Sequence, residues 1–413
     1  MRLHITLPAV ALAGLCAVQP ALAWGAAGHE IVATIAQMHL YPQVLPVICS
    51  ILYPTEPAAS CTLASVATWA DKMRFRMRWS ASLHYVGGLD DYPPDDCEFP
   101  GTRGWAGKEN INVLGGIRNV SNILAQFVDD NAARGGVQAA SASELELAQE
   151  ALKFLVHFLG DVHQPLHLTG RDRGGNSVKV SWNGRVTNLH SLWDGLLIAK
   201  ALRSIPRNYT VPLPVPPMEA QLRGTIYDPY IRRIMWDGIG LGSYSDVPGR
   251  WEDELEDWLT CPPTPAQSQS FFGRAAQFVM GLKVTETDDE LVCPRAWAGP
   301  IHELNCDFIW PHALDPEPHH SVSDAHADID DHAHQHNCEG GVCSGDEEMH
   351  SLLGGPGNVG VVPASNNYLE LDTPEYSGAI SKAWVVEKLL AQGGIRLAAV
   401  LNDIFAPLAE GSA

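Results

Sequence analysis

The chain has 413 residues, and its 27 Lys and Arg against 48 Asp and Glu give a formal net charge of −21 at pH 7. This acidity excludes a general electrostatic attraction to nucleic acid or to an anionic membrane surface. An anionic substrate would therefore need positive charge concentrated at one site, and bound cations are the obvious source. No apolar run after residue 23 predicts a membrane span, and the C-terminus carries no hydrophobic anchor signal.

Residues 1–23 are typical of a secretory signal peptide. Arg2 precedes an apolar stretch, and Ala21-Leu22-Ala23 has the small-x-small form of a cleavage site. A first buried helix is the alternative, but Pro20 and the Ala-x-Ala end argue against it. We expect a soluble, secreted, extracellular product that begins at Trp24 and has no membrane association.

Helical spacing of apolar residues dominates the remaining chain and predicts a mostly helical single domain over 24–413. Thr62 and Ser141 are predicted N-caps, the latter with Glu144 in a capping box. Residues 177–187 predict a small β-hairpin that turns at Asn183-Gly184. The predicted helices cover 28–40, 62–75, 110–128, 141–162, 188–202, 253–259, 268–282 and 374–405.

Between about residues 315 and 367 the sequence is rich in His, Asp, Gly and Pro and lacks periodic apolar residues. This composition predicts a flexible surface insertion within the domain. The segment holds many of the 17 histidines, so loose metal binding is an alternative to a solvated loop.

Nine cysteines are present, and Cys16 would leave with the signal peptide. The even set that remains predicts disulfides in an oxidising compartment, but the sequence leaves their connectivity open. Local pairs Cys49–Cys61 and Cys338–Cys343 are the simplest assignment. Asn119 and Asn208 begin glycosylation sequons. The remaining cysteines are Cys49, Cys61, Cys97, Cys261, Cys293, Cys306, Cys338 and Cys343.

Two His/Asp pairs with helical spacing, His157 with Asp161 and His190 with Asp194, flank His167. Residues four apart share a helix face, so each pair can direct an imidazole and a carboxylate at one zinc ion. One such pair is usually a solvated surface pair. Here apolar residues surround both pairs, and polar groups that are buried need partners. The stretch therefore predicts a metal site.

Three further candidate ligands precede that stretch. Asp71 is followed by Arg74 three residues later, which is also the spacing of an ordinary helix ion pair. His84 lies in a predicted extended segment, where a lone His is more often a satisfied core residue. Signal removal would expose the amine of Trp24 near His29. An α-amine has a reference pKa near 8 and can bind metal, although a frayed terminus is the usual outcome.

Taken in order, these motifs resemble the S1/P1 nuclease family of secreted, zinc-dependent nucleases. The resemblance covers nearly all of the mature chain except 315–367. It implies a mainly α, single-domain helical fold of the phospholipase C/P1 nuclease type, with a small β-hairpin and three Zn²⁺ at the bottom of a cleft. The most specific motifs are the Trp24-Gly25-Ala26 start with His29, Trp69-Ala70-Asp71, Leu83-His84-Tyr85, the run from His157 to His167, and the run from Gly174 to Asp194.

The resemblance also implies which residues hold each ion. Because Trp24 must be the first residue of the mature chain, signal cleavage would be part of building the site. The implied ligands are Asp71, His84, His157 and Asp161 for the first zinc, the amine and carbonyl of Trp24, His29 and a second oxygen of Asp161 for the second, and His167, His190 and Asp194 for the third.

By the same resemblance, hydroxide bridging two zinc ions attacks phosphorus, and the third zinc stabilises the leaving 3′-oxygen. Asp71 and Asp161 belong to this catalytic pair of ions, and Arg74 neutralises charge on the phosphate. The implied substrates are single-stranded DNA, RNA and 3′-nucleotides, with 5′-phosphorylated products. The resemblance implies no protein partner, and we expect a monomer.

Base recognition departs from the family pattern. Tyr85 is implied to stack on a base and Asn176 to hydrogen-bond its edge, although core packing is an equal alternative for Tyr85. Better-known members carry Asp where this chain has Gly87. Asp90 and Asp91 are the next carboxylates along the sequence and the candidates to take its place.

Two other functions remain open at this point. Bacterial phospholipases C share a trizinc constellation and an N-terminal Trp, but the Gly174-Gly175-Asn176 motif and Arg74 favour a nuclease. A secreted metal-binding protein would account for the His-rich insertion.

Overall fold

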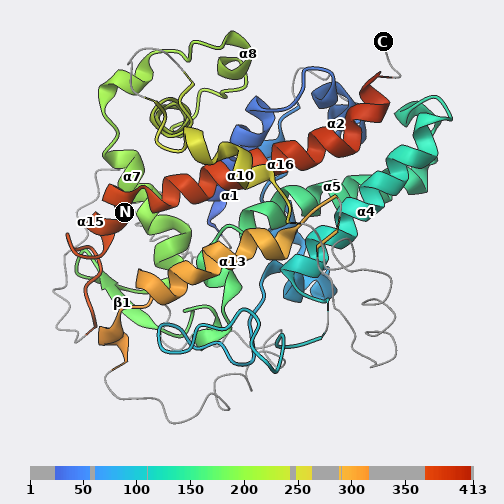
Figure 1. Cartoon of the computed structure of the whole chain (residues 1–413). Coiled ribbons are helices and arrows are strands. Elements are labelled where there is room, and N and C mark those ends of the chain that lie inside the picture. The colour runs from blue at the N-terminus through green and yellow to red at the C-terminus, as the bar shows by residue number, and fades with distance from the viewer. Residues whose placement is uncertain are drawn as a thin grey trace, which may run out of the picture.

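The computed structural model describes residues 24–55, 61–108, 110–241, 248–262, 288–289, 291–315 and 368–410. These residues form a mainly helical body with a two-stranded sheet, as predicted (Figure 1). The helices and strands are α1 Ala26–Met38, α2 Val44–Leu52, α3 Trp69–Met73, α4 Val113–Ala132, α5 Ala142–Asp161, β1 Lys179–Trp182, β2 Arg185–Asn188, α6 Leu189–Ser191, α7 Leu197–Arg203, α8 Pro216–Glu219, α9 Asp228–Arg233, α10 Leu255–Leu259, α13 Pro294–Leu304, α15 Ser377–Ala383 and α16 Val385–Glu410. Short 3-10 and π segments are η2 Leu63–Ser65, η3 Arg78–His84, η4 Val137–Ala139, η5 Pro165–Leu168, η6 Arg171–Arg173, η7 Leu192–Leu196, η8 Arg207–Thr210, η9 Ile234–Gly238, η10 Glu252–Glu254, η11 Asn305–Ile309 and η12 His312–Leu314.

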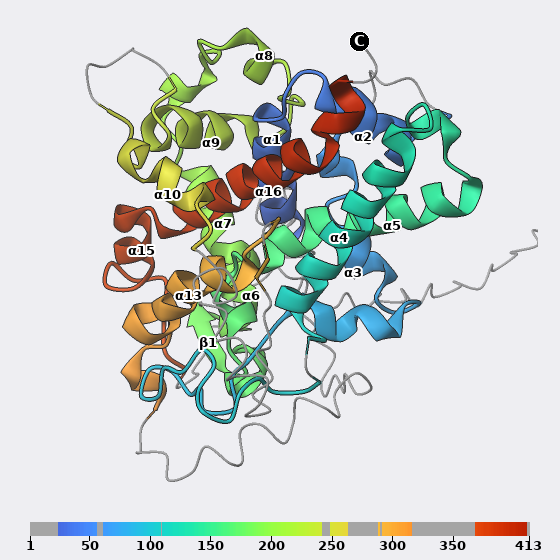
Figure 2. The same cartoon turned by 45° about the vertical axis from the view of Figure 1, so that its right-hand side comes forward.

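Helix α16 organises the core. It crosses the molecule against α1, α2, α4 and α5 (Figures 1 and 2). Ile31 and Ile35 of α1 and Leu401 of α16 are completely buried between these helices. Burying one such side chain contributes about 1.5–3 kcal/mol, so this packing fixes α1 firmly beside α5.

By length and composition, α16 is also apolar enough to cross a membrane. The prediction that no run after residue 23 has this property was therefore wrong. However, 78% of its apolar window is buried inside the protein. A helix covered on nearly all sides by other helices is expected to be apolar all round, and its hydropathy needs no membrane to explain it.

Helix α5 carries two of the predicted ligands on its C-terminal turn. It begins at the predicted capping box: Ser141 Oγ accepts from Glu144 N–H at 3.3 Å, and Glu144 accepts from Ser141 N–H at 2.7 Å. The capping box, together with Arg134, lowers the pKa of Glu144 to about 2. From Phe154 onwards α5 is buried on every face, so its polar residues there must find partners inside the protein.

Several predicted helices are interrupted. The segment 62–75 forms η2 and α3 separately. Thr62 occupies the N-cap position of η2, as predicted, but its side chain makes no capping hydrogen bond. The segment 374–405 breaks at Trp384, whose left-handed φ of 58° separates α15 from α16. The segment 188–202 contains the π turn η7. The predicted helix at 268–282 lies outside the described residues.

The predicted hairpin forms as β1 and β2, with Lys179 opposite Asn188 and Trp182 opposite Arg185. Asn183 and Gly184 both have positive φ, which is the conformation required by the tight two-residue turn. Glu370 accepts hydrogen bonds from both of their backbone N–H groups. The hairpin connects the Gly174-Gly175 turn, which precedes it, to α6, which follows it.

Three disulfides join the described cysteines. Cys49–Cys61 is the local pair that the sequence predicted, whereas Cys97–Cys306 and Cys261–Cys293 are long-range. Cys338 and Cys343 lie outside the described residues. The Cys97–Cys306 bond ties the loop after His84 to η11, and so joins two segments that border the predicted site.

Candidate metal centre

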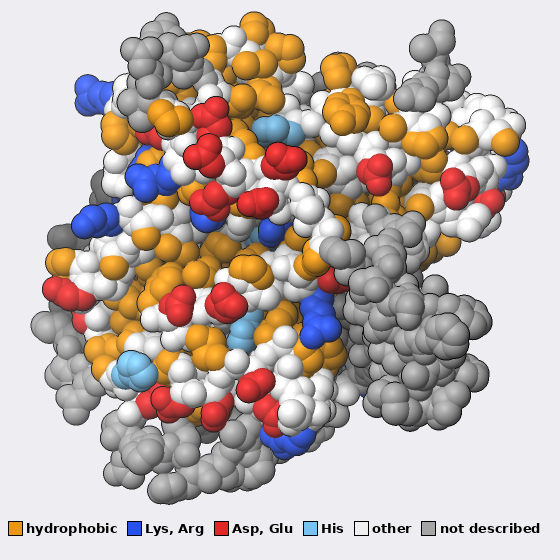
Figure 3. All heavy atoms as spheres, in the orientation of Figure 1, with side chains coloured by type: hydrophobic (Ala, Val, Ile, Leu, Met, Phe, Trp, Pro, Cys, Tyr) orange, Lys and Arg blue, Asp and Glu red, His pale blue; other side chains and the backbone are white. Residues whose placement is uncertain are grey.

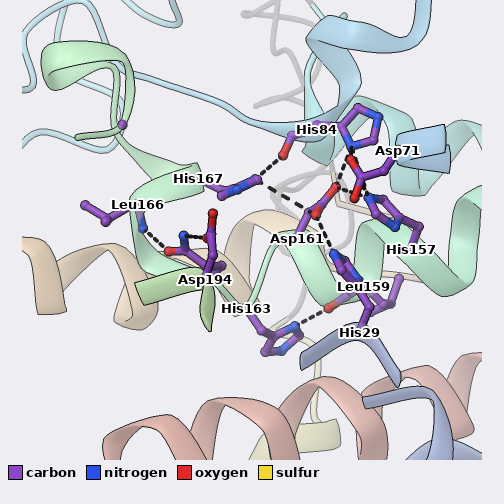
Figure 4. A network of polar contacts seen from close by, with 12 residues as sticks. His29, Asp71, His84, His157, Leu159, Asp161, His163, Leu166, His167 and Asp194 are labelled. Atoms are coloured by element: carbon purple, nitrogen blue, oxygen red, sulfur yellow. Dashed lines mark hydrogen bonds and ion pairs between the residues drawn. The ribbon is translucent and has the colours of Figure 1, made fainter. Parts of the chain in front are cut away.

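Asp161 is the centre of the polar cluster at the end of α5 (Figure 4). Its Oδ1 lies 3.3 Å from His29 Nε2, and its Oδ2 lies 3.0 Å from His84 Nδ1 and 3.3 Å from His157 Nε2. The two oxygens of one carboxylate thus face two different sets of imidazoles. Such an arrangement suits a carboxylate shared by two cations.

The partners of Asp161 come from elements far apart in the sequence. His29 lies on α1, Asp71 on α3, His84 at the end of η3 and His157 on α5. Asp71 Oδ1 is 3.6 Å from His157 Nε2 and 3.9 Å from His84 Nδ1. Two groups of donors result, each with its atoms within 4.8 Å of one another: His29, His157 and Asp161, and Asp71, His84 and His157.

A third donor group consists of His167, His190 and Asp194. The His167 and His190 rings lie 5.0 Å apart, and His190 Nε2 is 3.4 Å from Asp194 Oδ2. His167 lies on η5, His190 on α6 and Asp194 in the π turn η7. His167 Nδ1 is 4.0 Å from Asp161 Oδ1, so this group adjoins the other two.

Backbone carbonyls orient three of the imidazoles. The Nδ1–H of His157 donates to Ala67 O at 2.7 Å, that of His167 to His84 O at 2.6 Å, and that of His190 to Gly174 O at 2.7 Å. Each bond leaves the unprotonated Nε2 facing the donor groups. Orientation of a ligating His through its other ring nitrogen is the usual arrangement at metal sites.

Two glycines make room for this geometry. A Cβ on Gly160 would lie 2.4 Å from His29 Nδ1, so only glycine lets the imidazole pack against α5. Gly174 has a φ of +63°, and a Cβ there would lie 2.4 Å from Leu166 O. The Gly174 turn can therefore approach His190 closely enough to accept its hydrogen bond.

Burial sets the charge of these groups. Burial lowers the pKa of His157 well below its usual value, and lowers that of His167. Burial, and then the neighbouring His167, lower the pKa of His190 to about 3. Burial would raise the pKa of Asp161, but His157, His29 and His84 together hold it well below the usual range. Burial therefore favours the neutral form of the His157, His167 and His190 imidazoles, which is the form that binds metal.

Many donor atoms lack a partner. Burial raises the pKa of Asp71 to about 6, which shows how poorly its charge is compensated by the protein. Polar atoms this deeply buried are normally hydrogen-bonded, and each orphan costs about 1–3 kcal/mol. Cations at the three groups would satisfy them. Buried atoms of the donor groups that make no hydrogen bond within the described residues include both ring nitrogens of His29, both oxygens of Asp71, His84 Nε2, Asp161 Oδ1 and His167 Nε2.

Comparison with known proteins agrees with this donor set. The family model described as S1/P1 Nuclease matches residues 24–230, which include all three donor groups.

The chain belongs to the S1/P1 nuclease family. Endonuclease 2 of Arabidopsis thaliana is 29% identical over 407 residues, which cover 98% of each protein. Nuclease P1 of Penicillium citrinum is 36% identical over 181 residues, 43% of this chain and 60% of that protein. Nuclease S1 of Aspergillus oryzae is 34% identical over 189 residues, 45% of this chain and 58% of that protein.

In this S1/P1 nuclease, sequence reasoning missed one residue that supports the third donor group. Gln164 is completely buried, and its Nε2 donates to Asp194 Oδ1 at 2.7 Å while its Oε1 accepts from Leu166 N–H at 2.6 Å. Asn305 donates to Pro165 O at 2.7 Å and so holds the same turn from outside. A polar residue directly before Pro165, between two ligands, was the available signal.

Two other predicted residues border the donor groups. The charge of Arg74 contributes, after burial, to the pKa of both Asp71 and His190, so its guanidinium lies near both. Trp24 is completely buried, and the next residue, Gly25, donates its N–H to Asp194 O at 2.8 Å. The Trp24-Gly25 segment is therefore held beside the third donor group.

The residues expected to bind a base lie at the surface. Tyr85 follows His84 in extended backbone and is 39% exposed, which favours ring contact with a ligand over core packing. Asn176 donates to Arg173 O at 2.9 Å. Gly87 cannot be replaced by Asp without a backbone shift, because a Cβ there would lie 2.7 Å from Gly170 N.

Neither nearby carboxylate takes the place of the missing Asp. Asp90 pairs with the exposed Arg103. Asp91 is completely buried and accepts from His302 Nε2 at 2.8 Å. The two sequon asparagines, Asn119 on α4 and Asn208 in η8, are exposed.

Proposed function

We propose that this S1/P1 nuclease is a secreted, zinc-dependent endonuclease that hydrolyses single-stranded DNA and RNA to 5′-phosphorylated products and also acts as a 3′-nucleotidase. The observation that carries the proposal is the set of three adjoining His/carboxylate groups around Asp161, with buried donor atoms that lack hydrogen-bond partners. Imidazole and carboxylate donors without cysteine suit zinc in an oxidising compartment.

Asp71, His84, His157 and Asp161 would hold one Zn²⁺, Trp24, His29 and Asp161 a second, and His167, His190 and Asp194 a third. Bound there, zinc would supply an activated water and Lewis acidity toward phosphate oxygens. Three divalent ions carry twice the charge of the carboxylates of Asp71, Asp161 and Asp194, so the filled site would attract a phosphodiester despite the net charge of −21.

The protein's own residues would orient the reaction. Asp161 would hold two cations together through its two oxygens, since these face different imidazoles. Arg74 lies near two donor groups and would neutralise charge on the phosphate. Tyr85 would stack on a base and Asn176 would contact its edge. With a glycine at 87, base preference would be weak.

The domain would span 24–413 after removal of residues 1–23, with 315–367 as a surface insertion. The decisive experiment uses purified secreted protein whose N-terminus has been sequenced. We expect Trp24 as the first residue, three zinc ions per chain, and hydrolysis of single-stranded DNA, RNA and a 3′-mononucleotide. Activity on phosphatidylcholine vesicles without activity on nucleic acid would establish a phospholipase C instead. Full activity with extra residues before Trp24 would refute the role of the amine.

A further inference from the structure

We propose that residues 72–79 form a binding surface for the part of a single-stranded nucleic acid that extends beyond the cleaved phosphodiester. This basic-aromatic segment, Lys-Met-Arg-Phe-Arg-Met-Arg-Trp, begins directly after Asp71 and leads toward His84. The inference rests on the proposed function and adds to it a second contact with the substrate.

The segment is an exception to the charge of the chain. Lys72, Arg74, Arg76 and Arg78 follow one another at every second position, and residues 72–89 include no Asp or Glu, in a protein of net charge −21. By contrast, the face drawn in Figure 3 carries acidic side chains scattered among basic and apolar ones. A local run of cations without carboxylates attracts phosphate groups.

Three of these four cations face solvent. Lys72, Arg76 and Arg78 are exposed, and none forms an ion pair with a carboxylate in the described ranges of the chain. Elsewhere, exposed or partly exposed Arg103, Arg118 and Arg134 are each paired with an acidic side chain. An anionic partner of the segment would therefore not have to displace an internal carboxylate.

Two aromatic rings accompany the cations, with Phe75 between Arg74 and Arg76 and Trp79 directly after Arg78. Phe75 is 56% exposed and Trp79 is 58% exposed, both unusual for side chains of this size. The guanidinium of Arg74 lies 5.6 Å from the centre of the Phe75 ring. Exposed rings interleaved with cations are how proteins bind single strands without reading sequence, because every base has a face that can stack.

The backbone holds this surface in a fixed shape. Arg76 N–H and Met77 N–H both donate to Met73 O at 2.8 Å, and Ser80 N–H donates to Met77 O at 2.8 Å. Met77 packs on the hydrophobic core. A turn anchored by its inward side chain therefore holds the outward cations and rings in place. Little conformational entropy of these side chains is then lost when a nucleic acid binds.

The segment also lies beside the metal centre. The Trp79 ring contacts Phe154 at 5.6 Å between centroids, and Phe154 is one helical turn before His157 on α5. A strand whose phosphate reaches the donor groups would continue over this surface. A mononucleotide would reach Arg74 with its phosphate but would be too short to touch Phe75, Arg76 or Arg78.

Cations and aromatic rings could also bind an anionic membrane. We favour nucleic acid because the segment joins the candidate phosphodiester site, and because the net charge of the protein opposes approach to an anionic bilayer. Binding to phosphatidylserine vesicles therefore enters the test as a separate outcome.

The test compares wild type with Arg76→Gln/Arg78→Gln and with Phe75→Ala, all zinc-loaded and full length. A matched control, Arg203→Gln/Lys382→Gln, makes the same charge change at exposed positions of α7 and α15, which Figure 2 places away from α3. Kinetics are measured on a single-stranded 20-mer and on a 3′-mononucleotide over a series of salt concentrations. Zinc content and Tm confirm that each variant is folded.

We expect the double Arg variant to lose about fivefold or more in kcat/KM on the 20-mer, with a slope of log(kcat/KM) against log salt that is shallower by about 1.4 for two phosphate contacts. Phe75→Ala should lose about fivefold or more, as for one unstacked base. Neither should change on the mononucleotide, and the control should match wild type on both substrates.

Wild-type kinetics of both variants on the 20-mer would overturn the inference and leave the proposed nuclease intact. Loss of binding to phosphatidylserine vesicles with unchanged 20-mer kinetics would assign the surface to a membrane and would also overturn it. If wild type cleaves neither nucleotide substrate, the proposed function fails. Anisotropy of the uncleaved, labelled 20-mer would then decide whether the variants bind it more weakly.

Discussion

Replacing Gln164 by Leu should weaken one metal site of the three. The amide is completely buried and joins Asp194 Oδ1 at 2.7 Å to Leu166 N–H at 2.6 Å. Leu has a similar volume but offers neither a donor nor an acceptor. The substitution would remove a hydrogen-bond partner from each of two buried groups, and one of them belongs to the candidate ligand Asp194.

The size of the effect follows from these two bonds. Each orphaned buried group costs about 1–3 kcal/mol, so we expect a loss of about 2–6 kcal/mol in the free energy of unfolding. Loss of a residue that orients a metal ligand typically lowers metal affinity about 10- to 100-fold. The substitution changes only the side chain of Gln164, which bonds to Asp194 and to Leu166 N–H, so we expect only the ion at His167, His190 and Asp194 to be affected.

The assay is zinc bound per chain after equilibrium dialysis over a range of free zinc, together with Tm and kcat on single-stranded DNA. We expect one ion to dissociate at about 10- to 100-fold higher free zinc than in wild type. Gln149→Leu is the matched control, since Gln149 lies on the same α5 but donates to Ile51 O far from the donor groups. Three ions held at wild-type affinity, or equal weakening of all three, would refute the assigned role of Gln164.

Three further predictions follow from the same contacts. Gly160→Ala should displace the His29 ring, cost about 1–3 kcal/mol of stability and release the ion tied to His29, which Tm and zinc counts would show. Acid should remove zinc and activity together. Burial lowers the pKa of His190 to about 3, whereas its pKa in the unfolded chain is near 6.5, so the stability that the protein has above pH 6.5 declines as the pH falls toward 3. Activity that persists after the zinc has left would contradict this prediction. Deletion of 316–367 should leave nuclease activity intact, provided that Asp315 is kept as the partner of the buried Arg171; loss of activity and zinc together would favour a direct metal-binding role for the insertion.

The local part of the site could be predicted from sequence. The spacing of His157 and Asp161 fixes both side chains on one helix face, and the apolar residues around them indicate burial. Asn183-Gly184 likewise determines its own turn, because both residues tolerate positive φ. Such predictions need only neighbours within one element.

The features that could not be predicted depend on contacts between segments that are far apart in the sequence. The role of Gln164 depends on where an oxygen of Asp194 lies, 30 residues later in the chain. Position 87 has no room for a side chain because the backbone of Gly170 packs against it. The Cys97–Cys306 bond joins residues that are 209 positions apart. The break at Trp384, with its left-handed φ of 58°, lies within an apolar pattern that predicts an unbroken helix.

The distribution of charge connects the metal centre with the basic-aromatic segment. Asp71 and Asp161 are buried carboxyl groups at the metal centre, and a metal-free centre in which they are ionised would repel phosphate. Filling it with divalent cations would reverse the sign, and the carboxylate-free residues 72–89 would extend that positive region outward along one path. Binding of a single-stranded nucleic acid should then depend steeply on salt concentration, even though the whole protein is acidic. The reason is that a polyanion responds to the charge within about one Debye length and not to the net charge of the protein.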